Sequence, residues 1–314
     1  MESFDIYRDI SERSGGDIYI GVVGPVRSGK STFITNFMEK LVLPHIDDKY
    51  EKERMMDELP QSANGKSIMT TQPKFVPNEA VKLKLAENVE ANVRLVDCVG
   101  YLIDGATGHM DGEKPRMVKT PWNDEEIPFH AAAEIGTKKV ITDHSTIGIV
   151  MTSDGSISTD LPRTAYVQAE ERAVGELKAL GKPFIVIVNS TVPTSQETEK
   201  LAQTLSEKYS NAVMAVNVAS MSESDILGIF EKVLMEFPLA DVDVKCSKWM
   251  RALPYTNKII ASLCETVAQK TADMKKMSDY EKLNIDFEDS EYFECIKAEL
   301  VEPGRGRVTF CVTP

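Results

Sequence analysis

The sequence predicts an α/β protein whose mostly parallel sheet is flanked by helices. Several short runs rich in valine and isoleucine are nearly continuous in apolar residues, as expected of strands that are covered on both faces. Amphipathic segments with helical spacing separate the later runs. Strands that alternate with helices in this way specify a parallel sheet.

The first elements follow a polar start. Residues 1–16 are polar and predict a flexible or loosely docked leader. Residues 17–24 are β-branched and aromatic, end in glycine, and predict a first buried strand. Residues 31–43 carry apolar side chains at helical spacing and predict a helix. Residues 45–78 are charged and then rich in Ser, Thr, Asn and Pro, which predicts a loop region.

The later elements alternate regularly. Further strands are predicted at residues 93–97, 145–151, 183–189 and 211–218. Helices are predicted at residues 162–180, 195–209 and 222–237, the last opening on a pattern similar to a capping box. The connection over residues 101–144 is long, and long loops are usually functional lids or contact surfaces.

The chain is long enough for more than one domain. Its 314 residues, at about 150 per domain, predict roughly two. The sequence pattern changes after Pro238, so the domain boundary is expected there. One domain is expected over residues 1–237 and another over residues 238–314. The second part, helical at 246–277 and strand-like at 307–312, predicts the start of a smaller α+β domain. Because the chain stops directly after that strand-like run, we expect this domain to be truncated.

Composition and charge exclude several classes of function. The chain has 36 basic and 49 acidic residues and a formal net charge of −13, which repels nucleic acids and anionic lipids but leaves room for a local basic pocket. There is no run of about 18 apolar residues and no signal peptide, so no transmembrane segment is expected. Five scattered cysteines indicate reduced, mostly buried thiols. Together these features predict a cytoplasmic protein.

The strongest signal lies between the first strand and the first helix. It is the G-x-x-x-x-G-K-S motif of the P-loop nucleoside triphosphatases, made here by Gly24, Pro25, Val26, Arg27, Ser28, Gly29, Lys30 and Ser31, followed by Thr32. The glycines let backbone N–H groups wrap phosphates, and the helix adds its positive N-terminal end. Lys30 is expected at the β- and γ-phosphates, and the Ser31 hydroxyl is expected to ligate Mg²⁺.

A phosphate loop also needs an acidic partner for the metal. Asp97 and Gly100 follow the second predicted strand in a D-x-x-G pattern. Asp97 is expected to hold Mg²⁺ through water, and the Gly100 N–H is expected to face the γ-phosphate. Between the two motifs, either Thr70 or Thr71 is predicted to close over Mg²⁺ and the γ-phosphate and so to sense the nucleotide state.

The order of these motifs resembles the translation-factor-related GTPase class of P-loop proteins. In that class an N-K-x-D element follows a later strand, and its aspartate pairs with guanine. Here the strand leads into Asn189-Ser190-Thr191-Val192, so the lysine and the aspartate are both missing. Guanine donors would be left unpaired, which makes ATP the expected nucleotide. Asn189 is expected either to touch the base or to brace the phosphate loop.

Two more positions depart from that class. Tyr101 follows D-x-x-G, where many members carry a glutamine that orients water, so slow hydrolysis or another group acting on the water is expected. Arg27 stands where some members carry an asparagine that binds potassium. Its guanidinium is expected either to place positive charge near the phosphates, like an arginine finger in cis, or to face solvent.

The whole chain resembles the stage IV sporulation protein A family, the spore-coat morphogenetic ATPases of endospore-forming bacteria. The resemblance rests on GPVRSGKST, TTQPKFVP, VRLVDCVGYLIDGATGH and TDLPRTAYVQAEERAVGELKALGKPFIVIVNS. It implies ATP hydrolysis coupled to polymerisation into a basement layer, on the mother-cell side of the forespore surface. It also implies partners: further copies of the chain, spore coat proteins, and a small amphipathic membrane peptide that binds a C-terminal region mostly absent here.

Two alternatives stay open at this point. One is a regulatory GTPase-like switch, against which the missing N-K-x-D element counts. The other is a structural assembly protein that binds nucleotide with little turnover, which Tyr101 in place of glutamine favours.

Overall fold

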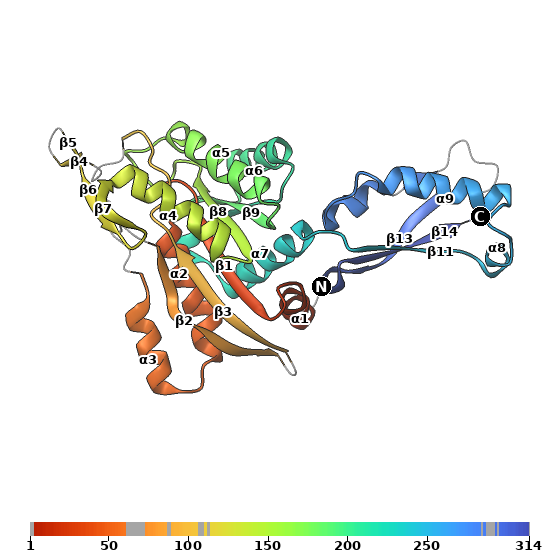
Figure 1. Ribbon diagram of the computed structural model, residues 1–314, viewed down its shortest axis with the longest axis horizontal. Helices are drawn as coiled ribbons and strands as arrows, with labels where there is room; N and C mark the ends of the chain where they lie inside the picture. The colour runs from red at the N-terminus through yellow and green to blue at the C-terminus, as the bar shows by residue number, and fades with distance from the viewer. Residues whose placement is uncertain are drawn as a thin grey trace.

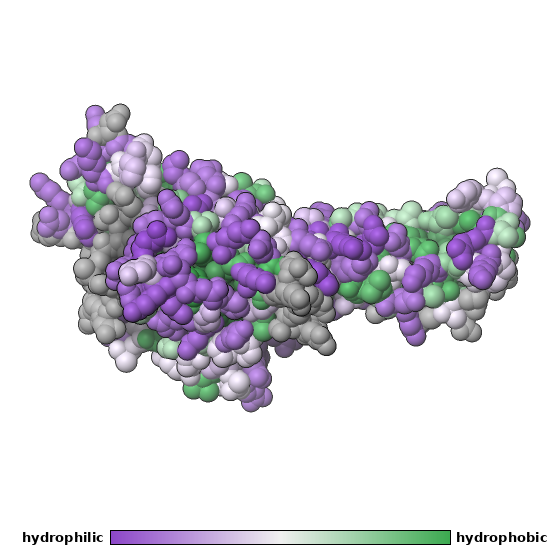
Figure 2. Space-filling model, turned by 90° about the horizontal axis from the view of Figure 1, so that it is seen from below, coloured by the Kyte–Doolittle hydropathy of each residue, from purple (hydrophilic) through white to green (hydrophobic). Residues whose placement is uncertain are grey.

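A computed structural model describes the chain at residues 3–60, 73–86, 89–105, 110–111, 114–283, 285–286, 293 and 295–313. Figure 1 shows a larger body, which carries most of the chain, and an elongated arm built from the C-terminal elements. Figure 2 shows mostly hydrophilic residues on one face of the body, and hydrophilic and hydrophobic residues side by side along the arm.

The body is built on a six-stranded sheet in the order β10-β9-β8-β1-β3-β2. Its strands are β1 (Asp17–Val23), β2 (Lys74–Ala86), β3 (Val89–Asp97), β8 (Ile147–Ser153), β9 (Phe184–Asn189) and β10 (Val213–Val216). All neighbours run parallel except β2 and β3, which are antiparallel. The predicted mostly parallel sheet is therefore confirmed.

Helices cover both faces of this sheet. They are α1 (Ser3–Arg13), α2 (Lys30–Phe37), α3 (Lys49–Glu58), α4 (Phe129–Asp143), α5 (Arg163–Ala179), α6 (Gln196–Tyr209) and α7 (Glu223–Glu236). Apolar side chains of α1, α2 and α7 form one core with one face, and those of α4, α5 and α6 form a second core with the other. The strands are buried on both sides, which explains why their sequences are continuously apolar.

The prediction of a flexible or loosely docked leader at residues 1–16 is wrong. The segment forms α1, whose side chains Ile6, Tyr7 and Ile10 are buried in the first core. Their spacing is helical, but intervening charged residues make the segment polar on average. The Arg13 guanidinium stacks on the ring of Phe237 with Cζ 5.0 Å from its centroid, so α1 also contacts the end of α7.

The prediction of a loop over residues 45–78 is wrong at two places. Helix α3 lies within it, and β2 begins there. Only Met55 of α3 is buried, so the helix lacks an apolar stripe in the sequence. It is instead started by the Asp48 side chain, which accepts a hydrogen bond from the Glu51 N–H at 2.8 Å.

The long connection over residues 101–144 contains regular structure. Two short antiparallel pairs, β4 (Met110–Asp111) with β5 (Lys114–Pro115) and β6 (Met117–Thr120) with β7 (Asn123–Pro128), precede α4. Helix α4 packs through small residues such as Ala132, Ala133 and Gly136. Such residues give only a weak apolar pattern in the sequence, so the helix was not predicted.

The arm is a smaller α/β unit. Its four-stranded sheet, in the order β11-β14-β13-β12, comprises β11 (Asp241–Lys245), β12 (Ile285–Asp286), β13 (Cys295–Glu302) and β14 (Arg307–Thr313). Helices α8 (Lys248–Arg251) and α9 (Lys258–Thr271) complete a separate core. We propose that the domain boundary lies at Pro238, where the chain leaves α7. Cys264 and Cys311 are exposed and only Cys98 is buried among the four described free thiols, so the expectation of mostly buried thiols is wrong.

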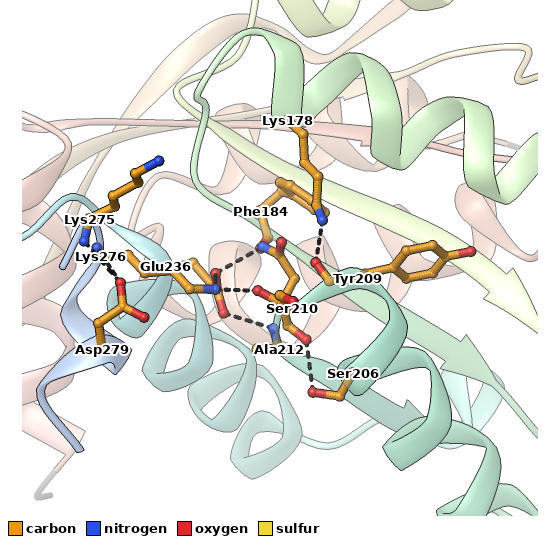
Figure 3. A network of polar contacts seen from close by, with 11 residues as sticks. Lys178, Phe184, Ser206, Tyr209, Ser210, Ala212, Glu236, Lys275, Lys276 and Asp279 are labelled. Carbon is orange, nitrogen blue, oxygen red and sulfur yellow. Dashed lines mark hydrogen bonds and ion pairs between the residues drawn. The ribbon is translucent and has the colours of Figure 1, made fainter. Parts of the chain in front are cut away.

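A partly buried ionic network joins the arm to the body (Figure 3). Glu236, at the end of α7, is 8% exposed. Its carboxylate accepts hydrogen bonds from Asn211 Nδ2 at 2.8 Å, the Ala212 N–H at 2.7 Å and Lys276 Nζ at 2.6 Å. Lys276 Nζ also donates to the Ser210 carbonyl at 2.6 Å. This junction therefore ties α7, the turn before β10 and the arm to one another.

Within the part of the chain that the structure describes, no helix is both long enough and apolar enough to span a membrane.

Candidate functional site

The predicted phosphate loop lies at the carboxyl ends of β1, β3 and β9, where parallel α/β sheets commonly bind ligands. The loop takes a left-handed backbone at Gly24, Arg27 and Gly29, with φ of 121°, 62° and 94°. A Cβ on Gly24 would collide with the Met151 carbonyl, and one on Gly29 would collide with the Asn189 amide. Glycine is therefore required at both ends of the loop.

Lys30, at the first position of α2, turns its side chain back beneath the loop. It is 5% exposed, and its Nζ donates to the Pro25 carbonyl at 2.7 Å and the Gly24 carbonyl at 3.5 Å. Burial lowers the pKa of Lys30. The ammonium thus has only uncharged acceptors, and phosphate oxygens at the loop would provide the missing negative charge.

Ser31 and Asp97 meet beside this lysine. The Ser31 hydroxyl donates to Asp97 Oδ2 at 2.7 Å, and Asp97 is 4% exposed. The other oxygen, Oδ1, is buried without a hydrogen-bond partner among the described residues. Burial raises the pKa of Asp97 despite the hydrogen bond from Ser31. A hydroxyl and a carboxylate with an unused buried oxygen are suitable ligands for Mg²⁺ or its bound water, so these residues fit the metal predicted from the sequence.

Gly100 lies directly over the phosphate loop. Its φ is 90°, and a Cβ there would collide with the Gly24 carbonyl and with Lys30 Nζ. The next residue, Tyr101, donates its N–H to the Gly24 carbonyl at 3.1 Å and accepts from the Val26 N–H at 2.9 Å. The D-x-x-G segment is therefore paired with the loop through its main chain.

Asn189 contacts the loop from the end of β9. Its Nδ2 donates to the Ser28 carbonyl at 3.1 Å, and its Oδ1 accepts from the Val218 N–H at 3.2 Å. Both polar groups of the amide are engaged in these contacts. They are the contacts expected of a residue that braces the phosphate loop, which was one of the two predicted alternatives.

The remaining loop residues are also placed. Pro25, Val26 and Ser28 are buried, and the Ser28 hydroxyl donates to the Pro25 carbonyl at 2.9 Å. Thr32 is half-buried in α2. The Arg27 side chain is half-buried too, with its Nη2 3.4 Å from the Ser158 hydroxyl in the loop after β8, and its role toward phosphate stays a prediction.

Thr70 and Thr71 lie outside the described residues. The described chain resumes at Pro73, and Lys74 at the start of β2 is in register with Asp97. The role of either threonine stays a prediction.

The structural role of the loop after β8 was not predicted from the sequence. Asp154 accepts hydrogen bonds from the Ser156 N–H at 2.8 Å and from the Thr198 hydroxyl at 3.1 Å. The Ser156 hydroxyl in turn accepts from the Thr191 N–H at 2.9 Å. This loop therefore supports the segment that stands in place of N-K-x-D. The signal was an Asp-Gly pair directly after a buried strand, which is typical of a structured turn.

Comparisons with known proteins show the family to which this chain belongs. Residues 1–238 match the family model described as Stage IV sporulation protein A, ATPase domain. Curated relatives named Stage IV sporulation protein A are 50% identical over 98% of this chain in Bacillus subtilis (strain 168), 48% over 98% in Bacillus anthracis and 50% over 96% in Clostridioides difficile (strain 630). The chain spans 62%, 62% and 61% of the lengths of these relatives.

Proposed function

The chain belongs to the Stage IV sporulation protein A family, and from that premise we propose that residues 24–32 bind ATP with Mg²⁺ and support its hydrolysis to ADP and phosphate. The observation that carries this proposal is the unused Oδ1 of Asp97, buried next to the Ser31 hydroxyl, in the domain that also buries Lys30 under the loop. Buried polar groups without partners are rare in folded proteins unless a ligand or water completes them.

Each residue has a distinct role in the proposed reaction. Lys30 leaves its carbonyl acceptors and stabilises the charge that develops on the transferring phosphoryl group. Ser31 and Asp97 hold the metal, which polarises the phosphates when bound. The Gly100 N–H faces the γ-phosphate. Either Thr70 or Thr71 closes over the metal, and Arg27 adds positive charge at the loop.

Adenine is the proposed base. At the position of the guanine-binding aspartate, Val192 is 56% exposed and carries no polar group. The Ser190 hydroxyl instead accepts a hydrogen bond from the Val192 N–H at 3.1 Å. Titration with ATP and with GTP tests this part: tight GTP binding with GTP turnover would contradict it and favour the regulatory GTPase alternative.

We further propose that the nucleotide cycle drives self-assembly of the protein into the basement layer of the spore coat. In this proposal the protein acts in the cytoplasm, on the mother-cell side of the forespore surface. Spore coat proteins and a small amphipathic membrane peptide would be bound through regions that the longer relatives have and this chain does not span.

The test measures turnover and assembly in the same samples. ATP turnover is followed by phosphate release while sedimentation follows assembly, for the natural sequence and for Lys30→Ala. The expected result is Mg²⁺-dependent ATP turnover that Lys30→Ala abolishes. Unaltered turnover in Lys30→Ala would contradict the assignment of the phosphate loop.

One observation favours a second function, nucleotide-dependent assembly with little turnover. The Tyr101 side chain points away from the phosphate loop and donates to Glu176 on α5 at 2.5 Å, so the position after D-x-x-G brings no amide to the attacking water. The same samples distinguish the two functions. Tight ATP binding and assembly without phosphate release would support this second function.

A further inference from the structure

Tyr101 occupies a position that joins the phosphate loop to the helices behind it. Its main chain forms a parallel bridge with Pro25, with hydrogen bonds of 2.9 Å to the Val26 N–H and 3.1 Å to the Gly24 carbonyl. Its neighbour Gly100 is the residue whose N–H would face a γ-phosphate. Any movement of Tyr101 would therefore move Gly100 relative to the loop.

The side chain of Tyr101 is anchored on α5 and, through one arginine, on α4. The ring is buried at 2% exposure, and the hydroxyl donates to Glu176 Oε2 at 2.5 Å. The Arg172 guanidinium lies over the ring, with Cζ 4.6 Å from the centroid. Arg172 also binds Glu134 on α4 through two hydrogen bonds of 2.7 and 2.9 Å, and its Nε donates to Glu176 at 3.3 Å. We call Tyr101, Arg172, Glu176 and Glu134 the tyrosine clamp.

Two contacts of the clamp hold the Tyr101 side chain most strongly, its hydrogen bond to Glu176 and the Arg172 guanidinium over its ring. A hydrogen bond to a carboxylate and a cation over an aromatic ring both exceed an ordinary neutral contact in strength. Burial, followed by the hydrogen bond to Glu176, raises the pKa of Tyr101, so the hydroxyl remains a donor at neutral pH. In GTPase switches the segments that contact the γ-phosphate become ordered only when it is present. Here Tyr101, the neighbour of the corresponding residue Gly100, is held by contacts within the protein itself.

We propose that Tyr101 is a positioning residue that fixes the Gly100 N–H at the γ-phosphate position before nucleotide binds. This inference rests on the proposed function of the phosphate loop. A fixed donor avoids the entropy cost of ordering a loop on binding, and that gain applies only to a ligand with a γ-phosphate. The clamp therefore increases the preference for nucleoside triphosphate over diphosphate.

The chain offers a matched control. Tyr209 also donates its hydroxyl to a glutamate of α5, Glu170, at 2.6 Å, and it is 5% exposed. It comes from the end of α6, and among the described residues its hydroxyl binds Glu170 rather than the phosphate loop. Removing either hydroxyl deletes a buried tyrosine–glutamate hydrogen bond, but only the Tyr101 bond supports Gly100.

The experiment compares Tyr101→Phe with Tyr209→Phe. Dissociation constants with Mg²⁺ are measured for ADP and for a non-hydrolysable ATP analogue, together with KM and kcat for ATP. In Tyr101→Phe we expect the affinity for the triphosphate analogue to fall about fivefold or more while that for ADP changes less than twofold. In Tyr209→Phe the ratio of the two affinities stays that of the natural sequence, even if the midpoint of thermal unfolding falls equally.

The outcomes separate the two proposals. If the natural sequence binds neither nucleotide, the proposed function fails, and this inference fails with it. If the natural sequence prefers the triphosphate and Tyr101→Phe keeps that preference, only the positioning role is overturned. An equal selective loss of triphosphate affinity in Tyr209→Phe also overturns the positioning role. Should Tyr101→Phe fail to fold, Glu176→Gln removes the charge of the acceptor while Tyr101 is kept, and the same selective loss of triphosphate affinity is expected.

Discussion

The protein has two clusters that each combine a lysine with a buried carboxylate, and they differ in how completely the carboxylate oxygens are paired. At the arm junction, the Glu236 carboxylate takes donors on both oxygens, one of them Lys276 Nζ at 2.6 Å. At the phosphate loop, Lys30 Nζ binds only main-chain carbonyls, and Asp97 Oδ1 has no partner among the described residues. Both carboxylates are buried, with Glu236 8% and Asp97 4% exposed, so the pairing of their oxygens is what distinguishes them.

We propose that this difference separates a structural cluster from a ligand site. A buried ion pair with all its hydrogen bonds made holds elements in place, whereas unpaired buried charges are costly unless a ligand completes them. Burial lowers the pKa of Lys30 and raises that of Asp97, so without ligand both groups are shifted toward their neutral forms. Perturbed pairs of this kind are typical of functional sites.

Replacing the lysine of the ligand site should have the largest effect on function. In Lys30→Met we expect ATP turnover to fall by a factor on the order of 10² to 10³ or more, because a cation aimed at the transferring phosphoryl group is lost. The free energy of unfolding without nucleotide should stay equal or rise, since a buried charge is replaced by an apolar side chain. Phosphate release and urea unfolding measure the two quantities. A large loss of stability would show that the two clusters are alike.

Replacing the lysine of the junction should have the opposite signature. In Lys276→Met, Glu236 is left buried without its cation, and we expect the free energy of unfolding to fall by about 3 kcal/mol. The affinity for nucleotide should change less than twofold, because the cluster lies at the amino end of β10 and the phosphate loop lies at the carboxyl ends of the strands. Loss of nucleotide binding in a folded Lys276→Met protein would contradict the separation of the two clusters.

The ligand site was more predictable from sequence than the junction. The site is made of short motifs at the ends of apolar strands, and parallel strands bring those ends together, so Lys30, Ser31 and Asp97 could be grouped in advance. The contact between Glu236 and Lys276 joins residues 40 positions apart, on either side of the proposed domain boundary at Pro238. No local pattern specifies such a pair.

The features that the sequence did not predict do not depend on a strong local apolar pattern. Helix α1 has apolar residues at the right spacing but is polar on average, and α3 depends on its Asp48 cap more than on an apolar face. The position of Tyr101 after D-x-x-G predicted only that the glutamine that orients water is absent. In the structure the Tyr101 side chain serves as an anchor on α5. Sequence gives the residue type after D-x-x-G, but the direction of the side chain depends on Glu176 and Arg172, which come from a distant helix.

Asn189 tests whether a fully paired residue within the ligand site behaves like the junction. In Asn189→Ala, the Ser28 carbonyl and the Val218 N–H lose their partner, and we expect the free energy of unfolding to fall by about 1–2 kcal/mol. Affinity for ATP should weaken by about tenfold or less, since the loop keeps its charged groups but loses a brace. Urea unfolding and nucleotide titration measure both. A complete loss of binding with no change in stability would place Asn189 among the ligand contacts instead.

An exposed ion pair extends the comparison to the smallest expected effect. Arg172 and Glu134 are paired at 2.7 Å, but their side chains are 45% and 43% exposed, so water competes for both charges. The hydrogen bond from Arg172 lowers the pKa of Glu134. A carboxyl whose pKa is lowered by folding stabilises the folded state above its ordinary pKa of about 4.3, and this contribution is lost as the pH falls through the lowered value. Glu134→Gln should therefore reduce the free energy of unfolding by about 0.5 kcal/mol at pH 7, and the difference should shrink as urea unfolding is repeated toward pH 4. A loss at pH 7 as large as that of Lys276→Met would mean that exposure does not weaken the pair, and that pairing alone decides what each ionic contact contributes to stability.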